Sequence, residues 1–295
     1  MRAFGWGRRD SEDPEPVRDL DFPAAIAREF PALFPAAWRA VEQTLAAVNG
    51  ADLSPLARRS PALEGYDWTA YLRCSVVRMV RALAALHRAG ALGGRLLDYG
   101  SYFGNFALAC RTLGYEVVAA DAYREYGTAF DRVRDLLRDA GVQIDDFADA
   151  GPSGARFDAI VALGVLEHVP HTPRPLLEAL DRRLEAGGVL VLDTPNLGYL
   201  YTREKLARGE SIFPPIERQF YTELPFEGHH REYLPREVKW MLEAIGHTGV
   251  EIETFNYSVY ALGAVRGADV ARLAEMDASP ELREIILSCS RRPAA

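Results

Sequence analysis

Residues 95–106 read RLLDYGSYFGNF, and this stretch decides the fold. Its apolar first half, preceded by Gly93 and Gly94, is typical of a short buried strand, which we place at 95–99. Gly100 follows at once and Gly104 opens a helical pattern, so the backbone can turn tightly with no Cβ in the way. A strand, a glycine turn and a helix in this order begin an α/β unit, which binds ligands at the carboxyl end of its strands.

The same alternation runs through the rest of the chain. We expect further strands at 116–120, 159–163 and 189–193, weaker strands at 142–145, 250–255 and 285–290, and helices at 105–113, 125–140, 173–185 and 235–245. Alternating strands and helices predict a parallel sheet that helices cover on both faces. Functional residues are therefore expected directly after the strands.

The remaining sequence divides into segments of different character. Residues 1–20 are rich in acids, arginine and proline and are expected to be disordered. Residues 21–92 have helical periodicity and predict an N-terminal helical cap, and the α/β domain occupies 93–295. Within that domain, 197–228 is too long for a simple connection and is rich in aromatic side chains, which predicts a lid over a substrate.

Composition excludes several classes of protein. The chain has 34 Lys and Arg against 42 Asp and Glu, a net charge of −8, and its arginine pairs are scattered, which argues against a nucleic-acid partner. Because no apolar run approaches the roughly 18 residues of a membrane span and the N-terminus is charged, we expect a cytoplasmic protein without membrane contact. The three cysteines are far apart, which indicates neither a disulfide framework nor a structural zinc site.

Two acids indicate a cofactor that contains a nucleoside. Asp121 ends the second expected strand, where an α/β unit places an acid to accept both ribose hydroxyls. NAD and S-adenosylmethionine both present such a ribose. A dinucleotide favours glycine where this chain has Tyr102, whereas Asp98, at the end of the first strand, suits a cofactor with an ammonium group. A NAD(P)-dependent oxidoreductase is thus the second enzyme class that the residues allow.

Several motifs in order resemble one enzyme family. These are LDYG at 97–100, Asp121, FDAIV at 157–161, VLEHV at 165–169 and GGVLVLDTPN at 187–196. They look like the successive motifs of class I S-adenosylmethionine-dependent methyltransferases, closest to the branch that includes the ubiquinone-biosynthesis O-methyltransferases, over about residues 93–246. The resemblance implies a Rossmann-like, mostly parallel seven-stranded sheet with an N-terminal helical cap and a lid insertion after strand five.

The resemblance also implies a set of cofactor-binding residues. Asp98 would lie near the amino group of the cofactor, Asp121 would hold the ribose, and Arg78 would bind the carboxylate. The full set is Asp98, Gly100, Ser101, Gly104, Asp121, Ala122, Asp146, Phe147, Leu163 and Arg78. The sequence departs from the family at Tyr102, where a glycine is usual. It also departs at Gly164, where the ubiquinone enzymes have a glutamate, and for this reason we expect no metal site.

Histidines are the candidate catalytic bases. His168 follows the fourth strand at the ligand-binding end of the sheet, and an unperturbed imidazole with a pKa of about 6.5 suits a base. His230 or His229 is the rival base, because both lie in HHREY at 229–233, which resembles a stretch that borders the acceptor pocket in related methyltransferases. Glu167 is expected to pair with His168 or to cap the turn. The alternative for each histidine is a hydrogen bond that braces its loop.

The candidate substrate-binding residues lie before the sheet and after strand five. They are Tyr66, Trp68, Tyr199, Tyr201, Phe220, His229 and Arg231. The alternative for the aromatic residues is burial in the core, which is common for such side chains. The function that we expect is methylation of a small organic acceptor at oxygen. N- or C-methylation, oxidoreduction and an inactive cofactor-binding scaffold are the alternatives, and the helical cap offers a surface for a homodimer.

Overall fold

The centre of the structure is a seven-stranded sheet with the strand order β4-β3-β2-β5-β6-β9-β7. The computed structural model describes residues 17–19, 22–57, 63, 65–147, 155–213, 215–222, 228–262 and 264–294. The strands are β2 (Arg95–Tyr99), β3 (Glu116–Asp121), β4 (Gln143–Asp146), β5 (Phe157–Leu163), β6 (Leu184–Pro195), β7 (Thr248–Phe255) and β9 (Ile285–Arg291). Only the pairings of β9, with β6 and with β7, are antiparallel in this sheet. The prediction of a mostly parallel seven-stranded sheet is confirmed.

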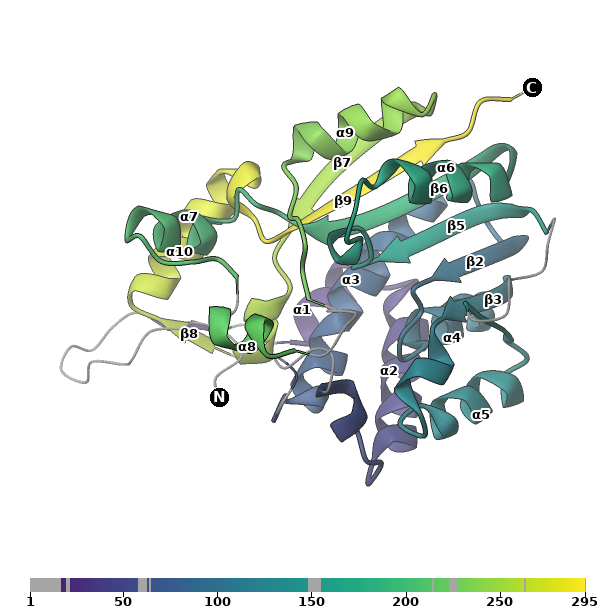
Figure 1. Cartoon of the computed structure of the whole chain (residues 1–295), viewed down its shortest axis with the longest axis horizontal. Helices are drawn as coiled ribbons and strands as arrows, with labels where there is room; N and C mark the ends of the chain where they lie inside the picture. The colour runs from purple at the N-terminus through teal and green to yellow at the C-terminus, as the bar shows by residue number, and fades with distance from the viewer. Residues whose placement is uncertain are drawn as a thin grey trace.

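Helices cover both faces of the sheet (Figure 1). Alternate residues of a strand point to opposite faces, so each face presents apolar side chains that pack in a cluster of their own. Leu96 and Val117 belong to a buried cluster shared with α2 (Phe34–Val48), α3 (Trp68–Arg88), α4 (Asn105–Thr112) and α5 (Asp131–Asp139). Their neighbours Leu97 and Val118 belong to a second cluster, shared with α6 (Arg174–Arg183) and α9 (Pro235–Ala244). The two-sided layering expected from the sequence is therefore present.

One expected helix is shorter than the sequence pattern suggested. The prediction of a continuous helix over 125–140 is wrong in its first half, since Tyr123–Tyr126 form a 3-10 turn, η3, and α5 begins at Asp131. Gly127, between them, has a positive φ of 57°, a conformation that no α-helix contains. The remaining elements match their expected positions to within a few residues.

The N-terminal helices are a layer of the main core. They comprise α1 (Ala24–Glu29), α2, the turn η1 (Ser54–Ala57) and α3, and the side chains of α2 and α3 share a cluster with the sheet. The expected disorder of 1–20 falls mostly outside the described residues. Val17–Asp19 form strand β1, which pairs antiparallel with β8 (Ala264–Arg266), so this short stretch departs from that expectation.

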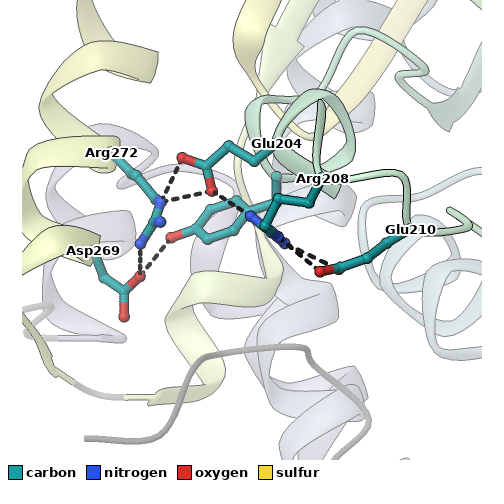
Figure 2. Close-up of polar contacts among 6 residues, drawn as sticks. Glu204, Arg208, Glu210, Asp269 and Arg272 are labelled. Atoms are coloured by element: carbon teal, nitrogen blue, oxygen red, sulfur yellow. Dashed lines mark hydrogen bonds and ion pairs between the residues drawn. The ribbon is translucent and has the colours of Figure 1, made fainter. Parts of the chain in front are cut away.

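A small side unit joins the insertion after β6 to the C-terminal part of the chain (Figure 1). It contains α7 (Leu200–Ala207), η5 (Ser258–Leu262), β8, α10 (Ala268–Ala278) and η6 (Pro280–Leu282) around a third buried cluster. Figure 2 shows Arg272 of α10 between Glu204 and Asp269. Its Nε lies 2.8 and 2.9 Å from the two carboxylate oxygens of Glu204. The first half of the insertion is thus docked on α10, while α8 (Ile216–Phe220) follows it with exposed side chains.

Among the described residues, the helices are too short or too polar to cross a membrane.

Candidate active site

The turn after β2 has the close backbone approach that its glycines predict. Gly100 has a φ of 75°, and a Cβ there would overlap the Val165 methyl Cγ2. Gly104, the N-cap of α4, has a φ of 66°, and its Cβ would lie 2.7 Å from Leu137. Tyr102 adopts the left-handed region as well, with a φ of 48°. The turn therefore keeps a glycine-like conformation at the position where the sequence departs from the family.

Asp98 is a buried carboxyl group with an incomplete set of partners. It is 2% exposed, and its Oδ2 has no hydrogen-bond partner among the described residues. Burial, and secondly the nearby carboxylate of Asp121, raise the pKa of Asp98 to about 8. A cationic group next to Oδ2 would both fill the missing contact and stabilise the charged form.

Asp121 holds the glycine turn through its side chain. Its Oδ2 accepts the N–H of Tyr102 at 2.7 Å, and its Oδ1 accepts the N–H of Ala122 at 2.7 Å. The hydroxyl of Ser101, in the same turn, lies 2.7 Å from the hydroxyl of Tyr123 and forms a hydrogen bond with it. Asp98, Ser101, Asp121 and Ala122 are thus brought together at the carboxyl ends of β2 and β3.

The expected adenine-reading residues lie on the other side of Asp121. Phe147 donates its N–H to the carbonyl of Asp121 at 2.9 Å, and its ring is 4.7 Å from that of Tyr99. Phe147 is 41% exposed, so one face of the ring is open to solvent. Asp146 accepts the N–H of Arg124 at 3.0 Å. This leaves an apolar ring and a carboxylate at the edge of the turn, which suits a purine base.

Trp68 packs on the glycine turn, and Tyr66 packs against Trp68. Their rings lie 4.9 Å apart, and Trp68 contacts Phe103 at 5.2 Å and Tyr102 at 6.2 Å between ring centroids. Edge-to-face contacts of this kind favour a fixed arrangement. The start of α3 therefore forms an aromatic wall beside the candidate cofactor turn.

Arg78 is bound to a buried acid. Its Nε donates to Asp193 Oδ2 at 2.8 Å, its Nη2 contacts Asp193 Oδ1, and the ring of Tyr257 lies 5.1 Å away. Asp193 also accepts the N–H of Gly164, the residue after Leu163, at 2.7 Å. The guanidinium group thus links α3 to the ends of β5 and β6, and it lies at the site that the sequence predicted but with a protein carboxylate as its partner.

Glu167, His168 and His229 converge next to this pair. Glu167 and His168 lie in η4 (Leu166–His168), directly after β5, and the ring of His168 is 5.0 Å from that of His229. The backbone N–H of His230 donates to the carbonyl of Glu167 at 2.7 Å, which holds the returning chain against η4. His229, for which the sequence suggested both a substrate contact and the role of a rival base, is therefore the histidine whose ring meets that of His168.

The charges of this group are coupled. Burial raises the pKa of Glu167. Burial also acts to lower the pKa of His229, but the hydrogen bond to Glu232 and the nearby Glu167 outweigh it and raise that pKa on balance. The Nδ1 of His229 lies 3.1 Å from Glu232 Oε1, and the hydroxyl of Thr194 donates to Glu167 Oε2 at 3.0 Å.

Other expected substrate residues lie away from this centre or have protein partners. Tyr201 donates to Asp269 at 3.1 Å inside the side unit, and burial raises the pKa of Tyr199, which bonds Ser258 there. Phe220, in α8, is 75% exposed. Arg231 pairs with Glu237 at 2.9 Å and covers the ring of Tyr233.

The sequence did not single out Asp193, Thr194 or Glu232. Asp193 and Thr194 end β6 at the ligand-binding edge, so their position after a buried strand was the available signal. Glu232 lies three residues after His229, and only the fold shows that its carboxylate points back to the imidazole.

Comparison with known proteins gives a family match. Residues 68–252 match the model of a family described as methyltransferase domain. No curated protein matches the chain. Similar solved structures include an S-adenosylmethionine-dependent methyltransferase from Mesorhizobium loti, with 18% identity over 74% of this chain and 98% of that chain and a TM-score of 0.49.

Two further structures illustrate the same likeness. The 1,6-didemethyltoxoflavin-N1-methyltransferase of Burkholderia thailandensis has 15% identity over 97% of this chain and 98% of that chain, with a TM-score of 0.48. Phosphoethanolamine N-methyltransferase 2 of Haemonchus contortus has 16% identity over 72% of this chain and 52% of that chain, with a TM-score of 0.45. This chain spans about half the length of the Haemonchus contortus proteins.

Proposed function

The chain belongs to the family of methyltransferase domains, and from this premise we propose that it transfers a methyl group from S-adenosylmethionine to a small organic acceptor. The observation that carries the cofactor assignment is the orphaned Oδ2 of buried Asp98, two residues before Gly100. A pyrophosphate would disfavour the charged form of Asp98 and gain no attraction from it, whereas an ammonium group would complete the contacts of the carboxylate.

The residues present fit this cofactor. Asp98 would face its amino group, Asp121 would accept its ribose hydroxyls, and Phe147 would cover its adenine. Gly100 and Gly104 give the turn no Cβ, so a ligand can lie directly on the backbone. When bound, S-adenosylmethionine supplies a sulfonium methyl, which the lone pair of the acceptor takes as the carbon–sulfur bond breaks and its electron pair stays on sulfur.

We place the acceptor at Glu167, His168 and His229. Glu167 and His168 follow β5 at the same edge of the sheet as the cofactor turn. Gly164 lies between the carboxylate of Glu167 and the guanidinium group of Arg78. A hydroxyl acceptor is a poor nucleophile until it loses its proton. We therefore propose O-methylation, with His168 or His230 as the base expected from the sequence and His229 as the neighbour that joins His168.

The insertion supplies the acceptor cover in this proposal. Phe213, Ile216, Phe220 and Tyr221 are exposed, and the chain that follows them returns to the site at His229. The half that contains α7 is fixed by Arg272, so the segment around α8 is the part that can fold over an organic acceptor.

Calorimetry with S-adenosylhomocysteine tests the cofactor, with NADH titrated in parallel. We expect micromolar binding of S-adenosylhomocysteine alone, and its loss in Asp121→Ala. Binding of NADH, or of neither ligand, would refute the proposal. An acceptor screen follows, and turnover that stays within a few-fold in His168→Ala, His229→Ala and His230→Ala would exclude a histidine base and favour N- or C-methylation.

A further inference from the structure

A cavity of about 430 Å³ opens between η3, α5 and the edge strand β4. Its lining, within the described residues, includes none of Glu167, His168 and His229, so it is separate from the proposed acceptor group. Organic ligands occupy protein cavities of roughly 300–1,000 Å³. The space is therefore large enough for a small metabolite.

Three arginine side chains line this cavity. Arg124 comes from η3, and Arg134 and Arg138 come from α5. Residues four apart lie on the same face of a helix, which is why both arginines of α5 reach the cavity. Asp146 also belongs to the lining, with its Oδ2 at 3.7 Å from Arg124 Nε. Three arginines against one aspartate leave two positive charges in excess, in a chain with a net charge of −8, and this local excess favours an anionic ligand.

The arginines of α5 form only loose or exposed ion pairs with their own helix. Arg134 Nη1 lies 3.8 Å from Asp131 Oδ1, which is longer than a hydrogen bond. Among the described residues, the Nε of Arg134 has no hydrogen-bond partner. Arg138 Nη1 lies 3.1 Å from Asp135 Oδ1, but both side chains are exposed. Exposed pairs contribute little to stability, so these guanidinium groups can turn toward an anion at small cost.

Much of the remaining lining is apolar. Val142 and Ile144 contribute aliphatic side chains, and Tyr123 contributes an aromatic one. An anion that carries an organic body would cover these side chains, whereas a bare ion would leave them in contact with water. Tyr123 also bonds through its hydroxyl to Ser101 of the glycine turn at 2.7 Å, so the cavity adjoins the candidate cofactor site without being part of it.

We propose that this cavity binds the phosphate monoester of a small organic molecule. Guanidinium groups bind phosphate oxygens through paired, charge-assisted hydrogen bonds. A phosphate monoester carries a charge of about −1.5 to −2 at pH 7, which matches the two excess positive charges of the lining. A single carboxylate would leave one of these charges unbalanced. The site goes beyond the proposed methyl transfer and does not depend on it.

Calorimetry on the full chain, in a phosphate-free buffer of low ionic strength, measures this binding with phenyl phosphate as the probe. We expect a single molecule of phenyl phosphate to bind per chain. Inorganic phosphate should bind more weakly because it lacks the organic body, and benzoate should bind more weakly because it has a single charge. Arg134→Gln and Arg138→Gln should each weaken the binding of phenyl phosphate at least about tenfold, as the loss of a hydrogen bond to a charged group does.

Arg132→Gln is the matched control. Arg132 lies on the same helix and carries the same charge, but it donates to the carbonyl of Asn49 at 2.9 Å and is outside the cavity lining. Its loss should change the affinity for phenyl phosphate by no more than about twofold. The thermal unfolding midpoint of each variant reports an intact fold. Because Arg138 is exposed, Arg138→Gln tests the site even where Arg134→Gln lowers that midpoint.

Three results would overturn the phosphate site. They are the absence of phenyl phosphate binding, an affinity for inorganic phosphate or benzoate that equals it, and an equal weakening in Arg132→Gln and Arg138→Gln. A saturating concentration of S-adenosylhomocysteine should leave phenyl phosphate binding intact, and displacement of the probe would assign it to the cofactor turn instead. Absence of S-adenosylhomocysteine binding alone would refute the proposed function and leave the phosphate site standing.

Discussion

Asp98 should release a proton when S-adenosylhomocysteine binds. Burial and the neighbouring Asp121 raise the pKa of Asp98 to about 8, so at pH 7 its carboxyl group is about 90% protonated in the unliganded protein. An ammonium group beside Oδ2 favours the carboxylate and lowers that pKa. Binding at pH 7 is therefore coupled to the loss of about 0.9 proton from this side chain.

The assay is calorimetry in two buffers that differ in their enthalpy of ionisation. The difference in the observed binding enthalpy gives the number of protons released. Only the ionised carboxyl group binds well. Because the ionised fraction rises about tenfold for each unit of pH below the pKa, the apparent affinity should rise about tenfold between pH 6 and pH 7. Asp98→Asn should bind more weakly, release no proton and show a flat profile over this range.

Protein stability gives an independent check of the same pKa. Because the folded pKa of Asp98 lies above its unfolded value, the stability linked to this proton is complete below about pH 4 and is lost as the pH rises through about 8. In denaturant titrations without ligand, the stability of Asp98→Asn should fall less than that of the unchanged protein as the pH rises from about 4 to about 8. Equal proton release in Asp98→Asn, or tight binding without proton release in the unchanged protein, would refute the reasoning.

Three further changes test the fold. Gly100→Ala sets a methyl against Val165 at a φ of 75°, so denaturation should show a loss of about 1–3 kcal/mol, and unaltered stability would contradict the close approach. Arg272→Gln removes the ion pair with Glu204, which should cost about 1 kcal/mol of stability or less and should speed hydrogen exchange in α7. The affinity for S-adenosylhomocysteine should stay constant. A weaker affinity would place α7 in the cofactor site. Burial lowers the pKa of His247, so the stability linked to it is present above about pH 6.5 and is lost as the pH falls further. His247→Gln should flatten the decline of Tm toward pH 5, and an unchanged slope would assign the decline elsewhere.

The geometry of the candidate cofactor turn could be predicted because it is encoded locally. The glycine turn, Asp98 and Asp121 each follow a buried strand, and parallel strands bring their carboxyl ends to one edge. Even the substituted position behaves as a glycine would, since Tyr102 takes a positive φ and its N–H is held by Asp121. Periodicity and turn chemistry were sufficient for these residues.

Arg78 shows where local reasoning stops. The sequence assigned it to the carboxylate of the cofactor, but its observed partner Asp193 is distant in the chain and becomes adjacent only when α3 packs against β6. The same holds for Tyr201, whose aromatic ring suggested substrate contact until α10 placed Asp269 on its hydroxyl. Such pairs depend on tertiary packing, which hydrophobic periodicity does not specify.

The acceptor half is built differently from the cofactor half. Glu167 and His168 belong to the turn after β5, whereas His229 arrives from beyond the insertion, where the backbone bond from His230 and the contact with Glu232 help to hold it. If the proposed function holds, changes in the insertion can alter the acceptor chemistry without disturbing the turn that Asp98, Gly100 and Asp121 form, because the acceptor half depends on one returning segment.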